Sequence, residues 1–215
     1  MKIVVKPTRT RRYHSPLRAA QAQATRAAIL DAAVTLFSER GYAGTTMQAI
    51  ADEAGVAVES VYALATKARL LELALERALD AGTETPLVQR PEVQAAAAIE
   101  DQREQLRAFA AFGAPLMRRN ALLSRAFVQA AATDENLAAR WREQEQRRLS
   151  DMRTLVEAVA RRGPLRPGLT VESAALTVWT LLNWYTAWLL CEEQGLSDEQ
   201  LAAWIEQALA SLLLP

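Results

Sequence analysis

The sequence has 215 residues, of which 51% are hydrophobic, and its 25 basic residues balance its 25 acidic residues. This length and composition allow one small and one larger domain, each with its own core. The single cysteine, Cys191, excludes a disulfide within the chain and provides no zinc-binding spacing, so we predict a protein of the reducing cytoplasm. We expect Cys191 to pack as an apolar side chain, because a redox sensor would need an exposed thiol of low pKa.

The charge is unevenly distributed along the chain. Residues 1–70 contain ten Lys or Arg and five Asp or Glu, which makes this part net +5 and the remainder net −5. Seven basic residues and no acidic residue precede Asp31. Such a segment binds phosphate with release of counterions, so we expect residues 1–24 to form a disordered, phosphate-binding arm. An organelle transit peptide or a merely solvated tail would have the same composition.

Three short helices are predicted after this arm. The apolar residues of the first recur at helical spacing: Ile29, Ala32, Ala33, Leu36 and Phe37. Gly41 is expected to end this helix, and Thr45 to cap the next with Gln48 as its reciprocal partner. Gly55 ends the second helix, and residues 57–62 predict a third that is too short to be stable without packing. This order is typical of a helix-turn-helix unit, whose partner is the major groove of double-stranded DNA.

These residues resemble the tetracycline-repressor (TetR) family of bacterial transcriptional regulators. The resemblance rests on residues that agree with the family in type, order and almost all spacings. They are residues 26–33 (RAAILDAA), 36–42 (LFSERGY), Thr45, Thr46, Ile50, Ala51, 54–56 (AGV), Tyr62 and Lys67. The resemblance implies an all-helical homodimer whose N-terminal unit binds a palindromic operator and whose variable C-terminal domain binds a small effector.

The sequence departs from the family pattern at two positions. Ala57 stands where the family usually carries Ser, so the third helix lacks a side-chain cap worth about 1 kcal/mol. After Tyr62 the family has an aromatic residue and then a lysine six positions on, whereas Lys67 follows at five. The turn before Lys67 is therefore one residue shorter than the family pattern.

A DNA-reading unit needs groups that bind phosphate and side chains that reach base edges. We expect Thr46, Ser60, Tyr62 and Lys67 to bind phosphate. The expected groove-facing residues are Val56, Ala57, Val58 and Glu59, and Arg26 and Thr45 complete the predicted DNA-binding set. The apolar groove-facing residues favour contact with thymine methyl groups, and Glu59 could accept a hydrogen bond from cytosine. The alternative is an ordinary helical subdomain with Tyr62 in its core.

The remaining sequence predicts an all-α chain of about nine helices, because patterns typical of strands are nearly absent. We place a helix-turn-helix domain with its connecting helix at residues 25–82 and an effector-binding and dimerisation domain at residues 83–215. The expected helices after the DNA-binding unit are 68–81, 92–113, 116–132, 135–162, 173–191 and 197–214. Gly113 and Pro115 are expected to separate the second and third of these helices.

Residues 173–191 contain no charged residue and are borderline in length for a membrane span. Asn183, four hydroxyl residues, the absence of a flanking basic anchor and the acidic pair Glu192 and Glu193 argue against a span. We therefore expect a buried helix and no membrane partner.

We expect helices 173–191 and 197–214 to pair with their copies as a four-helix dimer interface. The predicted interface residues are Val178, Leu182, Leu189, Leu201, Trp204, Ile205, Ala208 and Leu212. The predicted effector pocket comprises Phe109, Phe112, Met117, Phe127, Trp141, Asn183, Trp184, Tyr185 and Trp188. This lining suits an apolar or aromatic ligand, although each of these large residues could instead fill the core.

The sequence does not favour an enzyme. Its only histidine, His14, lies in the basic arm, and no glycine-rich phosphate loop is present, so we expect no metal or cofactor. We predict a transcriptional regulator, acting as a repressor, that is released from its operator by a small effector. The alternative is an architectural DNA-binding protein without an effector response.

Overall fold

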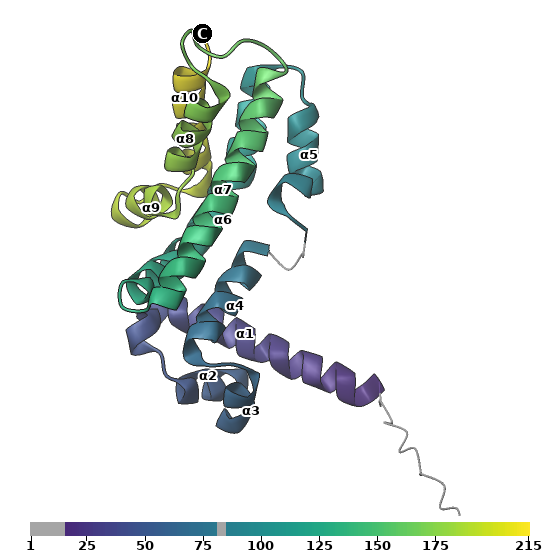
Figure 1. Cartoon of the computed structure of the whole chain (residues 1–215), viewed down its shortest axis with the longest axis vertical. Coiled ribbons are helices and arrows are strands. Elements are labelled where there is room, and N and C mark those ends of the chain that lie inside the picture. Colours follow the sequence, from purple (N-terminus) through teal and green to yellow (C-terminus); the bar gives the residue numbers. More distant parts are fainter. Residues whose placement is uncertain (1–15, 81–84) are drawn as a thin grey trace, which may run out of the picture.

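The computed structural model describes residues 16–80 and 85–215, and every regular element in these ranges is helical (Figure 1). The all-α prediction is confirmed. An N-terminal unit comprises α1 (Pro16–Gly44), α2 (Met47–Ala54), α3 (Val58–Leu64) and α4 (Lys67–Asp80). A C-terminal unit comprises the 3-10 turn η1 (Leu87–Gln89), α5 (Pro91–Ala98), α6 (Gln102–Ala131), α7 (Glu135–Ala160), α8 (Val171–Leu181), α9 (Trp184–Ala187), the π-helical turn η2 (Trp188–Glu193) and α10 (Asp198–Leu213).

The first helix begins earlier than predicted. α1 starts at Pro16, so the expectation of a disordered arm is wrong for residues 16–24, while residues 1–15 lie outside the described residues. Residues 19–24 contain only Ala and Gln, which are strong helix formers, and proline suits a first helical turn. In Figure 1 this part of α1 projects beyond the other helices of the N-terminal unit.

Two glycines set the path of the chain as predicted. Gly41 interrupts α1 with a φ of 69°, and Gly55 ends α2 with a φ of 65°. Both angles lie in the left-handed region that favours glycine. The turn at Gly55 redirects the chain into α3.

The cap of α2 lies one residue later than predicted. Thr46, not Thr45, is the N-cap, and its Oγ1 accepts a hydrogen bond of 3.1 Å from the main-chain N of Ala49. The predicted reciprocal bond from Gln48 is replaced by a bond of 2.8 Å from its Nε2 to Oδ1 of Asp52. Two adjacent threonines left the position of the cap ambiguous in the sequence.

The core of the N-terminal unit includes residues from the C-terminal unit. The fully buried side chains Ile29, Phe37 and Ile50 pack in one cluster with Leu123 and Phe127 of α6. α6 packs directly against both α1 and α4. Removing these side chains from water favours a fixed docking of the two units.

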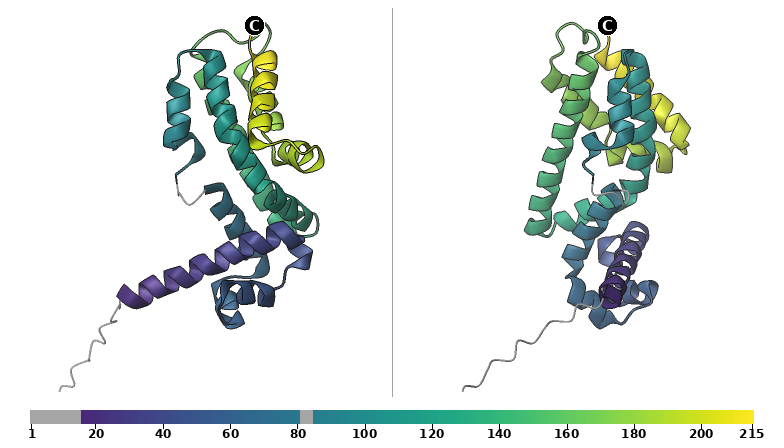
Figure 2. Two further views of the ribbon diagram at one scale, coloured as in Figure 1. Left: turned by 180° about the vertical axis from the view of Figure 1, so that it is seen from behind. Right: turned by 90° about the vertical axis from the view of Figure 1, so that its right-hand side faces the viewer.

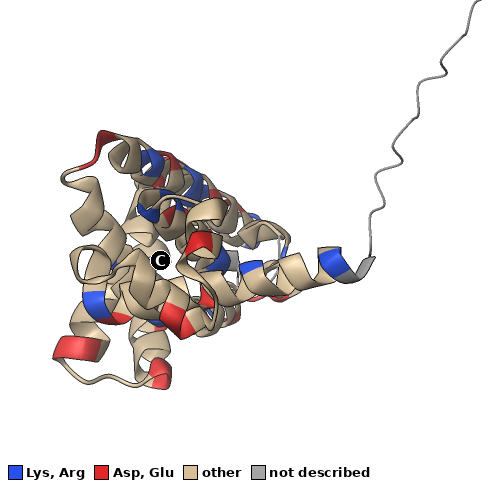
Figure 3. Ribbon diagram, turned by 90° about the horizontal axis from the view of Figure 1, so that it is seen from below, with Lys and Arg blue, Asp and Glu red and all other residues tan. Residues whose placement is uncertain are grey.

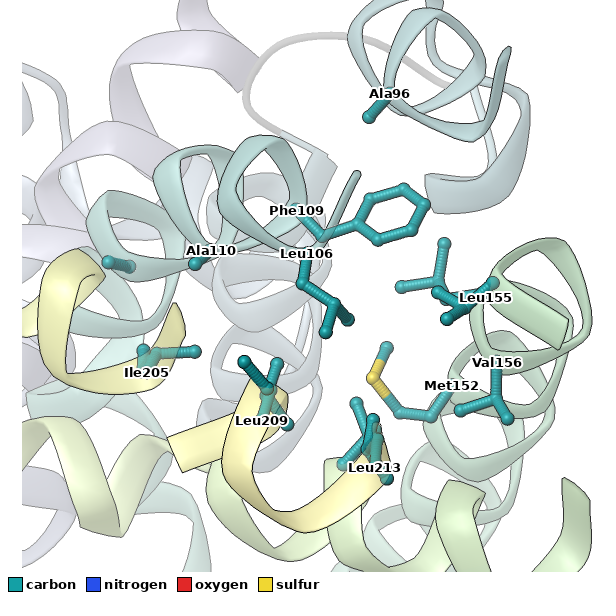
Figure 4. Close-up of a cluster of buried hydrophobic side chains, with 14 of the residues drawn as sticks. Ala96, Leu106, Phe109, Ala110, Met152, Leu155, Val156, Ile205, Leu209 and Leu213 are labelled. Carbon is teal, nitrogen blue, oxygen red and sulfur yellow. The ribbon is translucent and has the colours of Figure 1, made fainter. Parts of the chain in front are cut away.

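The C-terminal unit is organised around α6, its longest helix, which packs against α5, α7 and α10 (Figures 1 and 2). Its core contains Leu106 and Phe109 of α6, Met152 and Val156 of α7, and Leu209 of α10 (Figure 4). α8 packs on α7 and on α10. The C-terminal unit therefore has a separate apolar cluster of its own.

Two predicted boundaries in this unit are wrong. α6 continues through Gly113 and Pro115, which were expected to end a helix, and the real break follows Ala98 instead. Asp101 caps the new helix by accepting a bond of 2.9 Å from the main-chain N of Glu104. Pro115 removes one helical donor, but burial of the α6 residues around it outweighs that loss.

The uncharged segment 173–191 is also not one helix. α8 ends at Leu181, and Asn183 caps the short α9 through a bond of 2.9 Å from the main-chain N of Tyr185 to its Oδ1. Asn competes for main-chain donors in this way and so favours caps over helix interiors. No helix in residues 16–80 and 85–215 combines the length and apolarity that a membrane crossing requires.

Candidate nucleic-acid interface and ligand cavity

α3 lies at the end of the molecule opposite the C-terminus (Figure 1). Val61 is fully buried in the N-terminal core, whereas the adjacent Tyr62 is 64% exposed. Ala57 precedes the helix without a side-chain cap, as its methyl group dictates. A helix of seven residues is marginal alone, so packing around Val61 holds it with its other face open.

Most of the predicted DNA-binding residues are accessible. Ala57, Glu59, Tyr62, Thr46 and Arg26 are exposed. Val56, Val58, Ser60 and Lys67 are half-buried. Two of them, Arg26 of α1 and Ser60 of α3, line the same groove.

Thr45 is the exception, and its assignment as a DNA contact is wrong. Its side chain is 0% exposed, and its Oγ1 lies 3.0 Å from the main-chain O of Leu36 and 2.8 Å from that of Gly41. The hydroxyl donates to these carbonyl oxygens at the end of α1, where helix carbonyls lack partners. Thr45 therefore stabilises the turn between α1 and α2 and does not face solvent.

Lys67 begins α4 beside Tyr42. Its Nζ lies 4.4 Å from the centre of the Tyr42 ring, and burial lowers the pKa of this ammonium. Burial, together with the charge of Asp134, raises the pKa of the Tyr42 hydroxyl. A lysine at a helix N-terminus opposes the helix dipole, so this position disfavours the cation unless an anion is nearby.

A groove of about 510 Å³ separates the projecting part of α1 from α3. The exposed Arg18 and Arg26 line it from α1, and Ser60 lines it from α3. Figure 3 shows the basic segments on this part of α1. The run of basic residues before Asp31 indicated a positively charged segment here. It did not indicate that this segment is helical.

A cavity of about 490 Å³ lies in the C-terminal unit. The predicted pocket residues that line it are Phe109, Phe112, Met117, Trp141 and Trp184. The other four do not. Phe127 is buried in the N-terminal core, and Asn183 caps α9. Tyr185 is exposed and stacks on Trp188 at a ring distance of 5.7 Å.

The cavity also has a polar wall that sequence reasoning missed. Asn120 and Ser124 are buried one turn apart on α6, and Arg148 and Asp151 line the cavity from α7. Polar residues at a spacing of four on an otherwise apolar helix face were the available signal. Burial raises the pKa of the Asp151 carboxyl, although nearby Arg147 and Arg90 oppose this change.

Arg148 is fully occupied by neighbours within the protein. Its Nη2 lies 2.7 Å from Oε2 of Glu145, and its Nη1 donates to the main-chain oxygens of Trp179 and Leu182. Its guanidinium also lies 4.8 Å from the centre of the Trp179 ring. Arg148 therefore ties α7 to the end of α8, whose last carbonyls need donors.

The cavity extends to the helix that connects the two units. Leu75 and Leu79 of α4 line it, and Leu75 also belongs to the N-terminal core. An occupant of the cavity would therefore contact α4 directly. Among the described residues, no three His, Cys, Asp or Glu side chains are grouped as metal ligands would be.

The predicted dimer interface is partly wrong. Val178 of α8 is buried inside the chain, where α8 packs on α7. Leu201 and Ile205 of α10 are buried because α10 packs on α6. Leu182 and Ala208 are half-buried. The exposed apolar residues of this region are Leu189, Trp204 and Leu212 from the prediction, together with Leu176 and Tyr185. The spacing of the hydrophobic residues identified an apolar stripe correctly. It could not show whether the stripe packs against another helix of the same chain or against a second copy.

These features define a class of helical proteins in which a helix-turn-helix unit is joined to a larger unit with a ligand-sized cavity. Residues 29–72 match the family model of bacterial regulatory proteins of the tetR family. The matched residues comprise α2, α3 and parts of α1 and α4, so the helix-turn-helix unit of this chain is similar to that of the family. A comparison with curated proteins finds no match.

Solved structures of TetR-family and other regulators share the fold over most of the chain. A TetR-family regulator from Rhodococcus sp. is 21% identical and has a TM-score of 0.67, covering 89% of this chain and 99% of that chain. A regulator from Saccharomonospora viridis in complex with choline is 18% identical with a TM-score of 0.71, covering 91% and 100%. FadR from Bacillus subtilis in complex with stearoyl-CoA is 17% identical with a TM-score of 0.68, covering 86% and 98%.

Proposed function

We propose that the protein is a transcriptional repressor that binds a palindromic operator as a homodimer and is released by a small effector. The observation that carries the proposal is the presentation of α3. Val61 fixes this helix in the core, while Ala57, Glu59 and Tyr62 remain exposed on its outer face. A short helix held in this way suits insertion into a major groove of DNA.

Phosphate-binding groups surround the proposed recognition helix. Tyr62 supplies an exposed hydroxyl, and Lys67 places a cation at the start of α4. Arg18 and Arg26 add two positive charges on the projecting part of α1. Contacts of this kind fix the register of a protein on the duplex, and base contacts from α3 would supply specificity.

A homodimer would present two copies of α3 to successive turns of a palindromic site. Leu176 of α8 and Trp204 and Leu212 of α10 are exposed apolar side chains on helices that pack together. An exposed apolar surface of this kind commonly marks an interaction site. We assign it to the second copy, because a palindromic operator requires a two-fold assembly.

The cavity supplies an effector site. It has a size typical of small-molecule sites, and its aromatic lining suits an apolar ligand. The related folds above hold ligands as different as choline and stearoyl-CoA, which supports a ligand site but names no ligand. A ligand that favours one position of α4 would shift the population towards dimers whose recognition helices no longer fit the operator.

Fluorescence anisotropy with DNA from upstream of the protein's own gene tests the proposal. Tyr62→Ala and Lys67→Ala should each weaken binding by about fivefold to thirtyfold, since each removes a phosphate contact of about 1–2 kcal/mol. Arg103→Ala removes an exposed positive charge from α6 and serves as the matched control. Unchanged binding by both α3–α4 variants would reject the contact assignment.

Analytical ultracentrifugation tests the homodimer. Leu212→Glu should shift the protein towards a monomer at micromolar concentration, because a charge would be buried without a partner. Ala139→Glu introduces the same charge at an exposed position of α7 and should leave the dimer intact. A wild-type protein that sediments as a monomer would reject the two-fold assembly.

A further inference from the structure

One carboxylate in the cavity lacks a direct partner. Within residues 16–80 and 85–215, no side chain forms an ion pair or hydrogen bond with Asp151. The other charges that line the cavity are engaged. Glu145 is paired with Arg148, and Arg147 lies 3.8 Å from Glu143. Asp151 is half-buried in the cavity wall, and its carboxylate has two oxygens that can accept hydrogen bonds.

A second acceptor in the same wall lacks a donor. Asn120 is 3% exposed, and its Nδ2 donates a bond of 2.8 Å to the main-chain O of Leu116. Its Oδ1 is buried and has no partner in the described part of the chain. This oxygen is closed to solvent, so Asn120 adds a polar residue to the wall but no open acceptor for a bound molecule.

The rest of the lining suits the body of an amphipathic molecule. Phe112, Trp141 and Trp184 contribute aromatic surface to the cavity. Aromatic faces attract cations as well as apolar groups. A volume of about 490 Å³ is within the range that small-molecule ligands occupy.

The arginines of the cavity do not offer an equally open anion site. Arg90 is 7% exposed and donates to the main-chain oxygens of Leu79 and Thr85. Arg147 is exposed towards solvent beside Glu143. The Asp151 carboxylate therefore lacks a direct partner at the cavity, while the guanidinium groups that line the cavity already have acceptors.

We propose that the cavity binds an amphipathic amine, whose protonated amino group pairs with Asp151 and whose apolar, aromatic body lies against Phe112, Trp141 and Trp184. This inference rests on the proposed function, because it names the chemical class of the effector. The amine would contact the cavity next to Leu75 and Leu79 of α4.

Three probes with the same body test the class of ligand: 4-phenylbutylamine, 4-phenylbutan-1-ol and 4-phenylbutanoate. Binding to the full chain is measured by calorimetry at neutral pH. The amine should bind about tenfold more tightly than the alcohol, because its positive charge attracts the Asp151 carboxylate and the neutral hydroxyl does not. The butanoate should bind most weakly.

Asp151→Asn should abolish the preference for the amine and leave binding of the alcohol unchanged. Glu157→Gln removes a carboxylate from α7 outside the cavity lining and should retain the preference. A tightest-binding butanoate would indicate an anion site and overturn the inference. An amine preference that survives Asp151→Asn, or no binding of any probe, would overturn it as well.

Binding of DNA is measured on the same preparations without the probes. Selective amine binding by a protein that does not bind its upstream DNA would retain the ligand class and reject the regulator. Tight DNA binding by a protein that does not distinguish the probes would retain the regulator and reject the amine. The two proposals therefore fail separately.

Discussion

Nη2 of Arg90 donates a hydrogen bond of 2.8 Å to the main-chain O of Leu79, in the last turn of α4. Arg119 of α6 makes the equivalent contact, 3.2 Å, with the main-chain O of Ala78. Carbonyl oxygens at the end of a helix lack partners, and positive side chains stabilise them. The end of the connecting helix is therefore held by two arginines of the C-terminal unit, one of which lines the cavity.

Arg90→Ala should lower the free energy of unfolding by about 1–3 kcal/mol, since it leaves carbonyl oxygens without their donor in a buried site. It should also weaken the effect of any ligand on DNA binding, because α4 would no longer follow the cavity wall. Arg119→Ala removes a donor at an exposed position and should cost less. Chemical denaturation measures both variants, and equal losses would contradict the role of Arg90.

Thr45→Val should destabilise the protein by about 1–3 kcal/mol, since the carbonyl oxygens of Leu36 and Gly41 lose their buried donor. Thr45→Ser keeps the hydroxyl and should lose less. Operator affinity of folded Thr45→Val, measured well below its Tm, should equal that of the wild type. A large loss of DNA affinity without a loss of stability would restore Thr45 as a DNA contact.

Pro115→Ala should raise the thermal stability of the protein. The substitution restores a main-chain N–H inside α6 and adds a stronger helix former at an exposed position. Calorimetry measures the Tm. Ala111→Gly, at another exposed position of α6, serves as a control and should lower the Tm. A lower Tm for Pro115→Ala would mean that the proline ring itself stabilises α6.

Asp151→Asn should stabilise the protein at neutral pH and change little at acidic pH. The folded pKa of Asp151 is raised by burial, against the attraction of Arg147 and Arg90. The folded state therefore binds the proton more tightly than the unfolded state does, and its stability falls as pH rises through the window between the two pKa values. Above this window the ionised carboxylate is a constant cost that the amide removes.

Thermal melts of the wild type and Asp151→Asn across this window measure the difference. The gap between their Tm values should widen as pH rises from acidic to neutral. A gap that narrows with rising pH would contradict the raised pKa. If Asp151→Asn both gains stability and loses the preference for the amine, the Asp151 carboxylate lowers the stability of the free protein and contributes to ligand binding.

The N-terminal unit could be predicted in detail because its elements depend on local patterns. The helical spacing of the apolar residues up to Phe37 predicts the first helix. The backbone freedom of Gly41 and Gly55 predicts the two turns. Thr45 and Thr46 show the limit of this approach. Both residues can cap a helix, and only the packing of α1 against α2 decides which one is buried.

The C-terminal unit was less predictable, because packing between distant segments determines its elements. α6 continues through Pro115 since α10, almost a hundred residues later, packs along it. The same contact buries Leu201 and Ile205, which the sequence alone equally allows at a dimer interface. Asn120 and Asp151 lie on different helices, so their shared cavity has no signal in a local pattern.

Quantitative footprinting of the wild-type protein and Tyr62→Ala on DNA upstream of its own gene tests the central claim most directly. The account predicts that the wild type protects a palindromic site at concentrations at least about a thousandfold below those needed on random DNA, and that Tyr62→Ala loses this protection. Equal binding of the wild type to upstream and random DNA would contradict a sequence-specific regulator.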